Sequence, residues 1–148
     1  MIEIERKFLV KGDFRPFVKR KIMITQAYLC ATPGCAVRVR IKDDSAYLTI
    51  KGPSNENGFS RMEFEYEIPL KDGKEIVKLS DSVIEKERFL VPVGKHTYEV
   101  DVFHGKYEGL IIAELELSSE TDSFQKPDWL GEEVTGNERY YNAYLSTH

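Results

Sequence analysis

Residues 61–68 read Arg-Met-Glu-Phe-Glu-Tyr-Glu-Ile, and this stretch decides the fold class. Apolar and charged side chains alternate along it, which is the period of a β-strand, because successive side chains of a strand point to opposite faces. Weaker patterns of the same kind predict strands over 22–30 and 83–91. The clear alternation of 61–68 returns along the chain at 2–8, 37–41, 47–51, 97–102 and 112–117.

The segments between these strands are short, which favours antiparallel pairing. The pattern predicts a mainly β (α+β) fold, in which about eight antiparallel strands form a closed or nearly closed β-barrel. A few peripheral helices are expected, at 70–79, 119–125 and 137–145. The length of 148 residues and the absence of a linker composition predict a single domain over 1–148.

Bulk composition excludes several classes of protein. The net charge of -4 argues against general nucleic-acid binding, which favours basic domains. No apolar run approaches the ~20 residues that a membrane helix needs. The first residues lack a basic region followed by an apolar stretch, so we expect no secretory signal and a cytoplasmic location. Cys30 and Cys35 are expected to be reduced thiols there, and the oligomeric state is left open.

The polar face of the predicted strands carries mostly glutamate, arginine and lysine, often with one sign per strand. Arg38 and Arg40 share a face, as do Glu114 and Glu116. Like charges two residues apart on a strand are ~7 Å apart, which is tolerable in water but unfavourable in an interior. Two interpretations remain at this point: a solvated outer face of a curved sheet, or a site for a charged ligand.

The charged residues fall into two groups with complementary chemistry. Carboxylates without cysteine or histidine suit hard divalent cations such as Mg²⁺ or Mn²⁺. Clustered arginine and lysine suit phosphate oxygens. A metal–polyphosphate complex needs both groups, and no Walker loop or dinucleotide fingerprint offers another phosphate site. The acidic group is Glu3, Glu5, Asp101, Glu114 and Glu116, and the basic group is Lys7, Arg38, Arg40, Lys51, Arg61, Lys86 and Arg88.

A set of motifs now identifies a resemblance. In order, the chain contains Glu-Ile-Glu-Arg-Lys at 3–7, Val-Arg-Val-Arg at 37–40, Thr-Ile-Lys-Gly at 49–52, Glu-Lys-Glu-Arg at 85–88, Glu-Val-Asp-Val-Phe at 99–103 and Glu-Leu-Glu at 114–116. This set resembles the CYTH family, the triphosphate tunnel metalloenzymes, and most of all its short bacterial inorganic triphosphatases. The resemblance covers nearly the whole chain.

The resemblance implies an eight-stranded barrel whose charged face turns inward around a tunnel. The acidic group then matches metal ligands for Mg²⁺ or Mn²⁺, with Asp101 a possible addition to the four glutamates. The basic group matches residues that bind the triphosphate. Tyr28 matches a proton acceptor, with Lys51 beside it as a catalytic residue, although Tyr28 could also be an ordinary strand aromatic. The apolar face would form an outer core that includes Ile4, Val39, Ile50, Phe64, Tyr66, Val100 and Leu115.

The implied activity is metal-dependent hydrolysis of a small-molecule triphosphate, with inorganic tripolyphosphate giving pyrophosphate and phosphate. Three alternatives stay open: an adenylate cyclase, a thiamine triphosphatase, and a polyphosphate-binding module without turnover. The intact acidic group argues against the binding module, because a protein that only binds polyphosphate could dispense with metal ligands.

Overall fold

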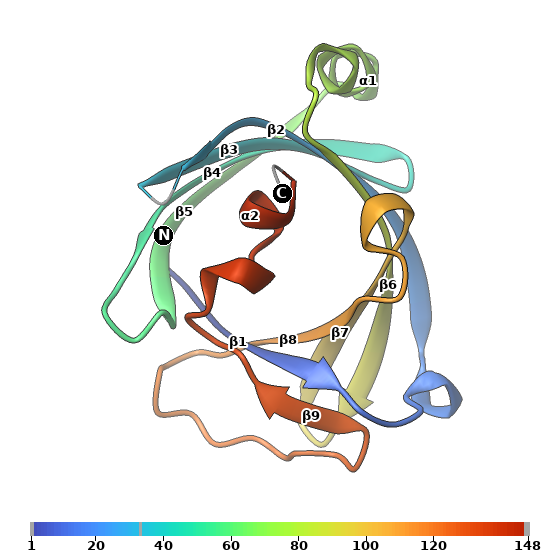
Figure 1. Cartoon of the computed structure of the whole chain (residues 1–148), viewed down its shortest axis with the longest axis vertical. Helices are drawn as coiled ribbons and strands as arrows, with labels where there is room; N and C mark the ends of the chain where they lie inside the picture. Colours follow the sequence, from blue (N-terminus) through green and yellow to red (C-terminus); the bar gives the residue numbers. More distant parts are fainter. Residues whose placement is uncertain (1, 33, 147–148) are drawn as a thin grey trace.

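The computed structural model of the protein describes residues 2–32 and 34–146, so residues 1, 33, 147 and 148 of the predicted domain lie outside it. A nine-stranded antiparallel sheet has the order β5-β4-β3-β2-β6-β7-β8-β1-β9, and a further pairing of β5 with β1 closes it into a barrel (Figure 1). The strands are β1 Ile2–Val10, β2 Arg20–Thr32, β3 Cys35–Lys42, β4 Ser45–Ser54, β5 Ser60–Ile68, β6 Val83–Val93, β7 His96–Phe103, β8 Ile111–Glu116 and β9 Leu130–Glu133.

The predicted fold class is therefore confirmed, and the weak patterns at 22–30 and 83–91 lie within β2 and β6. The α-helices are α1 Leu70–Leu79 and α2 Asn142–Leu145, with 3₁₀ turns at Arg15–Phe17, Gly105–Tyr107 and Glu138–Tyr140. None of the helices in the described ranges is long and apolar enough to cross a membrane. Cys30 and Cys35 are unpaired, as expected.

The first strand closes the barrel by using its two halves differently. Its beginning pairs with β5, with Glu3 opposite Arg61. Its later part pairs with β8, where Glu5 faces Glu116 and Lys7 faces Glu114. The edge that β5 leaves open is taken by β9, which pairs with the end of β1. Charged residues from three strands are thereby brought to one stretch of the barrel wall.

The outward face of β1, β6, β7 and β8 is covered by the segments that flank β9. A cluster of buried apolar side chains lies there, including Phe8, Val100, Leu115 and Trp129, with Ile4 packed against it. Because side chains alternate along a strand, burial of this outward set turns the intervening charged set into the barrel.

On the opposite side, α1 packs against β3 and β4. Gly73 of α1 lies so close to β4 that an added Cβ would be 2.5 Å from the Ala46 Cβ, and Val39 beneath it is fully buried. The cover stops before β5, where Phe64 is 43% and Tyr66 56% exposed. The expectation that these two aromatics belong to the covered core is wrong, since α1 packs mainly against β3 and β4 and not over β5.

Two of the three predicted helices differ from the structure. Residues 119–125 form a turn and then a segment without regular secondary structure, in which Phe124 packs edge-on against Phe8 and the Gln125 carbonyl accepts a hydrogen bond from the Tyr98 hydroxyl. The helix expected at 137–145 is split into a 3₁₀ turn and α2. The Asn137 side chain does cap the first of these, by accepting a hydrogen bond from the Arg139 amide.

The segment after β9 turns back into the ring of strands (Figure 1). Leu145 of α2 is buried in a cluster with Tyr28, Ala36 and Phe103, which belong to three barrel strands. Asn142 is buried as well, and its side chain bonds to β2 and β6. The C-terminal segment therefore fills part of the barrel interior.

Candidate active site

A polar cavity of about 260 Å³ runs inside the barrel. Seven cationic and seven anionic side chains line it, so a ligand that binds there must satisfy both signs. The cations are Lys7, Arg38, Arg40, Lys42, Lys51, Arg61 and Arg88, the anions are Glu3, Glu5, Glu63, Glu65, Glu99, Glu114 and Glu116, and Tyr28, Ala36, Thr49 and Asn142 complete the lining.

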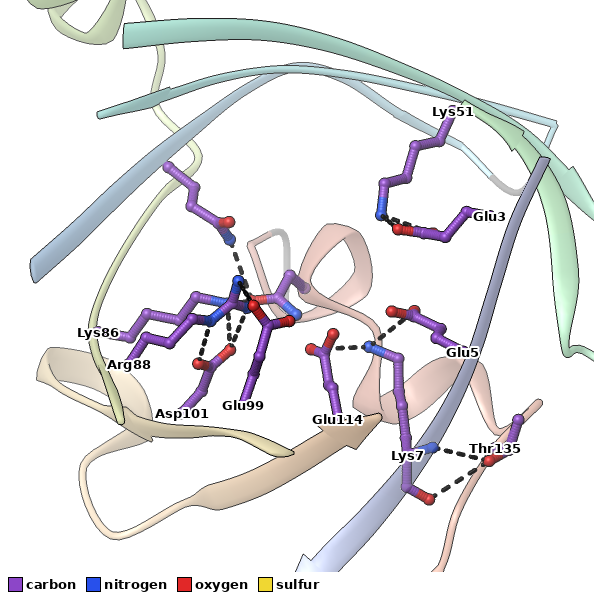
Figure 2. Close-up of polar contacts among 12 residues, drawn as sticks. Glu3, Glu5, Lys7, Lys51, Lys86, Arg88, Glu99, Asp101, Glu114 and Thr135 are labelled. Atoms are coloured by element: carbon purple, nitrogen blue, oxygen red, sulfur yellow. Dashed lines mark hydrogen bonds and ion pairs between the residues drawn. The ribbon is translucent and has the colours of Figure 1, made fainter. Parts of the chain in front are cut away.

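The charged group at the start of β1 centres on Glu3. Lys51 Nζ donates to both Glu3 oxygens, at 2.9 and 3.1 Å, as Figure 2 shows. Lys51 also lies 3.3 Å from Glu63, and Arg61 Nε lies 3.6 Å from Glu3. Burial opposes ionisation of Glu3, but the charge and hydrogen bonds of Lys51, a hydrogen bond with Glu63 and the charge of Arg61 together outweigh it and lower the pKa of Glu3 to about 2.

The second group on β1 shares one lysine between two carboxylates. Lys7 Nζ lies 3.3 Å from Glu114 and 3.6 Å from Glu5 (Figure 2). Burial and the nearby charge of Glu114 raise the pKa of Glu5 to about 7. Burial also acts against ionised Glu114, yet Lys7 and Arg88 hold its pKa well below the usual range. The single positive charge of Lys7 is thus too little to stabilise the ionised forms of both Glu5 and Glu114.

The basic wall of the cavity comes mainly from β3. Arg38 Nε is buried and has no hydrogen-bond partner among the described residues. Arg40 Nε donates to Gln26 Oε1 at 2.8 Å. Burial, together with the charges of Arg38 and Arg88, lowers the pKa of Arg40 to about 10. The basic wall therefore has more positive than negative charges, whereas the acidic side has more negative than positive charges.

Beneath the cavity lies an ionic cluster of Lys86, Arg88 and Asp101. The pattern of charges in the sequence could not predict this position. The Asp101 carboxylate accepts hydrogen bonds from Lys86 Nζ at 2.6 Å, Arg88 Nε at 2.8 Å and Arg88 Nη2 at 2.9 Å. Lys86 and Asp101 are 1% and 0% exposed. Of the predicted site residues, these two are absent from the cavity lining, while the other ten side chains of both charge groups and Tyr28 contribute to it.

Two amides that the sequence analysis missed connect this cluster to the basic wall. Asn142 Oδ1 accepts from Lys86 Nζ at 2.8 Å and from Gln26 Nε2 at 3.0 Å. Gln26 in turn accepts from Arg40. The position of Gln26, two residues before Tyr28 on one strand face, was an available signal. Asn142 gave none, because its place inside the barrel depends on the tertiary path of the C-terminal segment.

No three carboxylate, histidine or cysteine side chains in the described ranges converge closely enough to form a ready cation site. Glu5 and Glu114 instead pair with Lys7, and Glu3 pairs with Lys51. Hard oxygen donors are nevertheless the ligands that Mg²⁺ and Mn²⁺ prefer, and they lie together on two adjacent strands. The donor set fits a divalent cation, provided that these side chains turn toward it.

Comparison with known proteins assigns the chain to a family. The CYTH domain profile matches residues 1–145. The chain belongs to the CYTH domain family. Within it, an inorganic triphosphatase of Acetivibrio thermocellus is 46% identical over 145 residues, which are 97% of this chain and 92% of the relative. An inorganic triphosphatase of Nitrosomonas europaea is 34% identical over 153 residues, covering 99% and 97%.

Solved structures agree with the CYTH assignment. The crystal structure of the inorganic triphosphatase NE1496 superposes with a TM-score of 0.71 at 30% identity, covering 99% of this chain and 95% of that one. HpAC1 from Hippeastrum, described as having a dominant triphosphatase activity, has a TM-score of 0.62 at 15% identity, with coverage of 79% and 80%. At that identity the likeness concerns the fold alone.

Proposed function

We propose that this chain, as a single CYTH domain over residues 1–148, is a divalent-metal-dependent triphosphatase that hydrolyses inorganic tripolyphosphate to pyrophosphate and phosphate. The observation that carries the proposal is the cavity with charges of both signs, which is lined by seven cationic side chains and seven carboxylates. A cavity of about 260 Å³ lies below the roughly 300–1,000 Å³ of drug-sized ligand sites, which suits a short polyphosphate. The names of the two curated relatives support the same activity.

The basic wall would hold the phosphate chain. Arg38 offers a buried donor that the protein leaves unpaired, and a phosphate oxygen would satisfy it. Gln26 holds Arg40 through its Nε, so the outer N–H groups of Arg40 would bind phosphate in a fixed orientation. Arg88 is held by Asp101 through Nε and Nη2 and lies 3.4 Å from Glu99 through Nη1, so it would contribute mainly its positive charge.

The acidic side would hold Mg²⁺ or Mn²⁺ through Glu3, Glu5, Glu114 and Glu116. A bound cation would supply charge stabilisation for the transferred phosphoryl group. Binding requires Lys7 and Lys51 to give up carboxylate contacts, and the raised pKa of Glu5 shows that this carboxylate gains from a second positive charge. Asp101 has its oxygens engaged by Arg88 and Lys86, so we assign both it and Lys86 to positioning rather than to direct binding.

Tyr28 lines the cavity directly opposite Arg38 on the neighbouring strand. We propose that its oxygen, as the phenolate, accepts a proton from the attacking water and becomes the hydroxyl, with Lys51 near the reacting phosphate. The two unpaired cysteines suit a reducing compartment, in line with the cytoplasmic location expected from the sequence.

The test is phosphate release from tripolyphosphate, ATP, thiamine triphosphate and pyrophosphate, each with Mg²⁺, with Mn²⁺ and with EDTA. We expect metal-dependent turnover that is strongest on tripolyphosphate and abolished by EDTA. Turnover that persists in EDTA contradicts the metal role. Cyclic AMP formed from ATP and Mn²⁺, without phosphate release from tripolyphosphate, would identify a cyclase instead.

A further inference from the structure

A second cavity of about 510 Å³ lies against the end of the tunnel. Its lining comes from the ends of β2 and β3, the loop between β4 and β5, and the C-terminal segment. Ala36 and Arg61 line both cavities, so the two spaces meet at these side chains. Unlike the tunnel, the second cavity includes apolar and aromatic surface, from Ala31, Pro53 and Tyr141.

Tyr141 lies where the two cavities meet. The tunnel cations Lys7 and Arg61 are placed over its ring, with Lys7 Nζ 5.3 Å and Arg61 Cζ 5.4 Å from the ring centroid. Both distances are within the ~6 Å of a cation–π contact. The same side chain lines the second cavity. Its ring therefore contacts tunnel residues on one side and bounds the outer space on the other.

The ring is held in this place by its neighbours. The Tyr141 hydroxyl is 3.5 Å from Ser54 Oγ on the rim of the barrel. The next residue, Asn142, is bonded to Lys86 and Gln26, and Leu145 is buried among barrel side chains. On its other side, the Tyr141 amide donates a hydrogen bond to the Glu138 carbonyl at 3.0 Å, so the chain is held before and after Tyr141.

We propose that Tyr141 is a specificity-determining wall, which reserves the tunnel for an unsubstituted triphosphate and closes off a cavity able to take the nucleoside of a nucleoside triphosphate. This inference rests on the proposed triphosphatase activity. A nucleoside triphosphate carries a bulky group on one terminal phosphate, and the tunnel volume of about 260 Å³ is below the roughly 300–1,000 Å³ of sites for ligands of that size. The second cavity has the volume and the mixed polar and apolar lining of a small-molecule site.

The test compares tripolyphosphate and ATP as substrates of Tyr141→Ala, Tyr141→Phe and the unaltered protein, with Mg²⁺ present. Removing the ring should raise the ratio of kcat/KM for ATP to kcat/KM for tripolyphosphate at least tenfold, mainly through a lower KM for ATP. Tyr141→Phe should keep the original ratio, because it keeps the ring. Tyr140→Ala is the matched control: it removes an aromatic from the same segment that lines neither cavity, and should not raise the ratio.

An unchanged ratio in folded Tyr141→Ala overturns the proposal, as does an equal rise in Tyr140→Ala, which would indicate a loosened segment. Thermal melting establishes folding, and Tyr141→Leu, with an intermediate rise expected, replaces the alanine variant if that one unfolds. Should the unaltered protein hydrolyse no triphosphate, the proposed function fails on its own. The wall is then tested by calorimetric affinities for tripolyphosphate and a non-hydrolysable ATP analogue, where the same change in ratio is expected.

Discussion

Replacing Asp101 by asparagine separates a positioning role from a metal-binding role. The carboxylate is fully buried and accepts three hydrogen bonds from two cations. With asparagine, the positive charge of Arg88 stays buried without this anion, and Lys86 loses the carboxylate that favours its protonated form. Breaking a buried ion pair in this way costs about 3–5 kcal/mol of stability. For a domain of this length, that corresponds to a fall in Tm of about 6–20 °C.

The loss of stability should depend on pH in a defined direction. Burial, with the charges of Arg88 and Arg40 beside it, already lowers the pKa of Lys86 to about 7, below its value in the unfolded chain. Without Asp101 the pKa of folded Lys86 falls further. In the unaltered protein, the loss of stability caused by the low pKa of Lys86 is complete at about pH 7. In the variant, stability continues to fall as the pH drops below about 7. Chemical unfolding at pH 6 and pH 8.5 measures this, with the larger difference expected at pH 6.

The activity of the same variant completes the test. Since Arg88 loses the partner that orients it, KM for tripolyphosphate should rise, while the Mg²⁺ concentration for half-maximal activity stays the same. Glu116→Gln is the matched control, because Glu116 lines the cavity and has no ion pair within the described residues. It should change stability by less than about 0.5 kcal/mol. It should raise the required Mg²⁺ about tenfold, the effect of ~1.4 kcal/mol of lost ligation.

Two results would refute this reasoning about Asp101. One is a stability loss below about 1 kcal/mol, which would mean that the buried cations find other partners. The other is an increase in the required Mg²⁺ as large as that of Glu116→Gln, which would return Asp101 to the metal ligands.

Three further predictions concern the cavity and its cover. Glu5 has a folded pKa of about 7, above its unfolded value, so its contribution to the stability of the metal-free protein falls as pH rises from 4.5 to 7. Stabilisation by Mg²⁺, measured by thermal melting, should instead grow over pH 6–8. In Glu5→Gln the stabilisation by Mg²⁺ should lose this pH dependence. Tyr28→Phe should lower kcat by about 100-fold with little change in KM if the phenolate oxygen accepts a proton, and near-normal kcat would leave Tyr28 as a strand aromatic. Gly58→Ala should destabilise the protein by about 1–3 kcal/mol in urea unfolding. The φ of Gly58 is +79°, and an added Cβ would lie only 2.4 Å from the Gly136 Cα. An unchanged unfolding midpoint would show that the C-terminal segment is held in place by other contacts.

The wall formed by Tyr141 and the network through Asn142 give the C-terminal segment two separate tasks. Tyr141 bounds the space available to a substrate, whereas Asn142 reaches the phosphate-binding side chains through Gln26 and Lys86. Truncation of the whole segment would remove both, so single substitutions are the informative experiments.

Local sequence patterns are sufficient to predict the strands, their antiparallel class and the chemistry of the site. Alternation of period 2 is a local property, so every predicted strand is present, and α1 ends where its pattern ends. The two charge groups were also visible, because residue type and strand face are read directly from the chain. The resemblance to the CYTH family then supplied the direction of the charged face.

Which of the predicted site residues reach the cavity depends on the three-dimensional packing of the chain. Asp101 and Lys86 share the inward face with Glu99 and Arg88, yet they lie beneath the lining. They pair with each other, and Asn142 of α2 binds Lys86 from above. Phe64 and Tyr66 have the same pattern as buried positions, and they are exposed because α1 packs mainly against β3 and β4. The segment at 119–125 is not a helix, and Phe124 within it packs on Phe8 across the fold. Each of these outcomes depends on contacts between residues far apart in the chain, which no local pattern encodes.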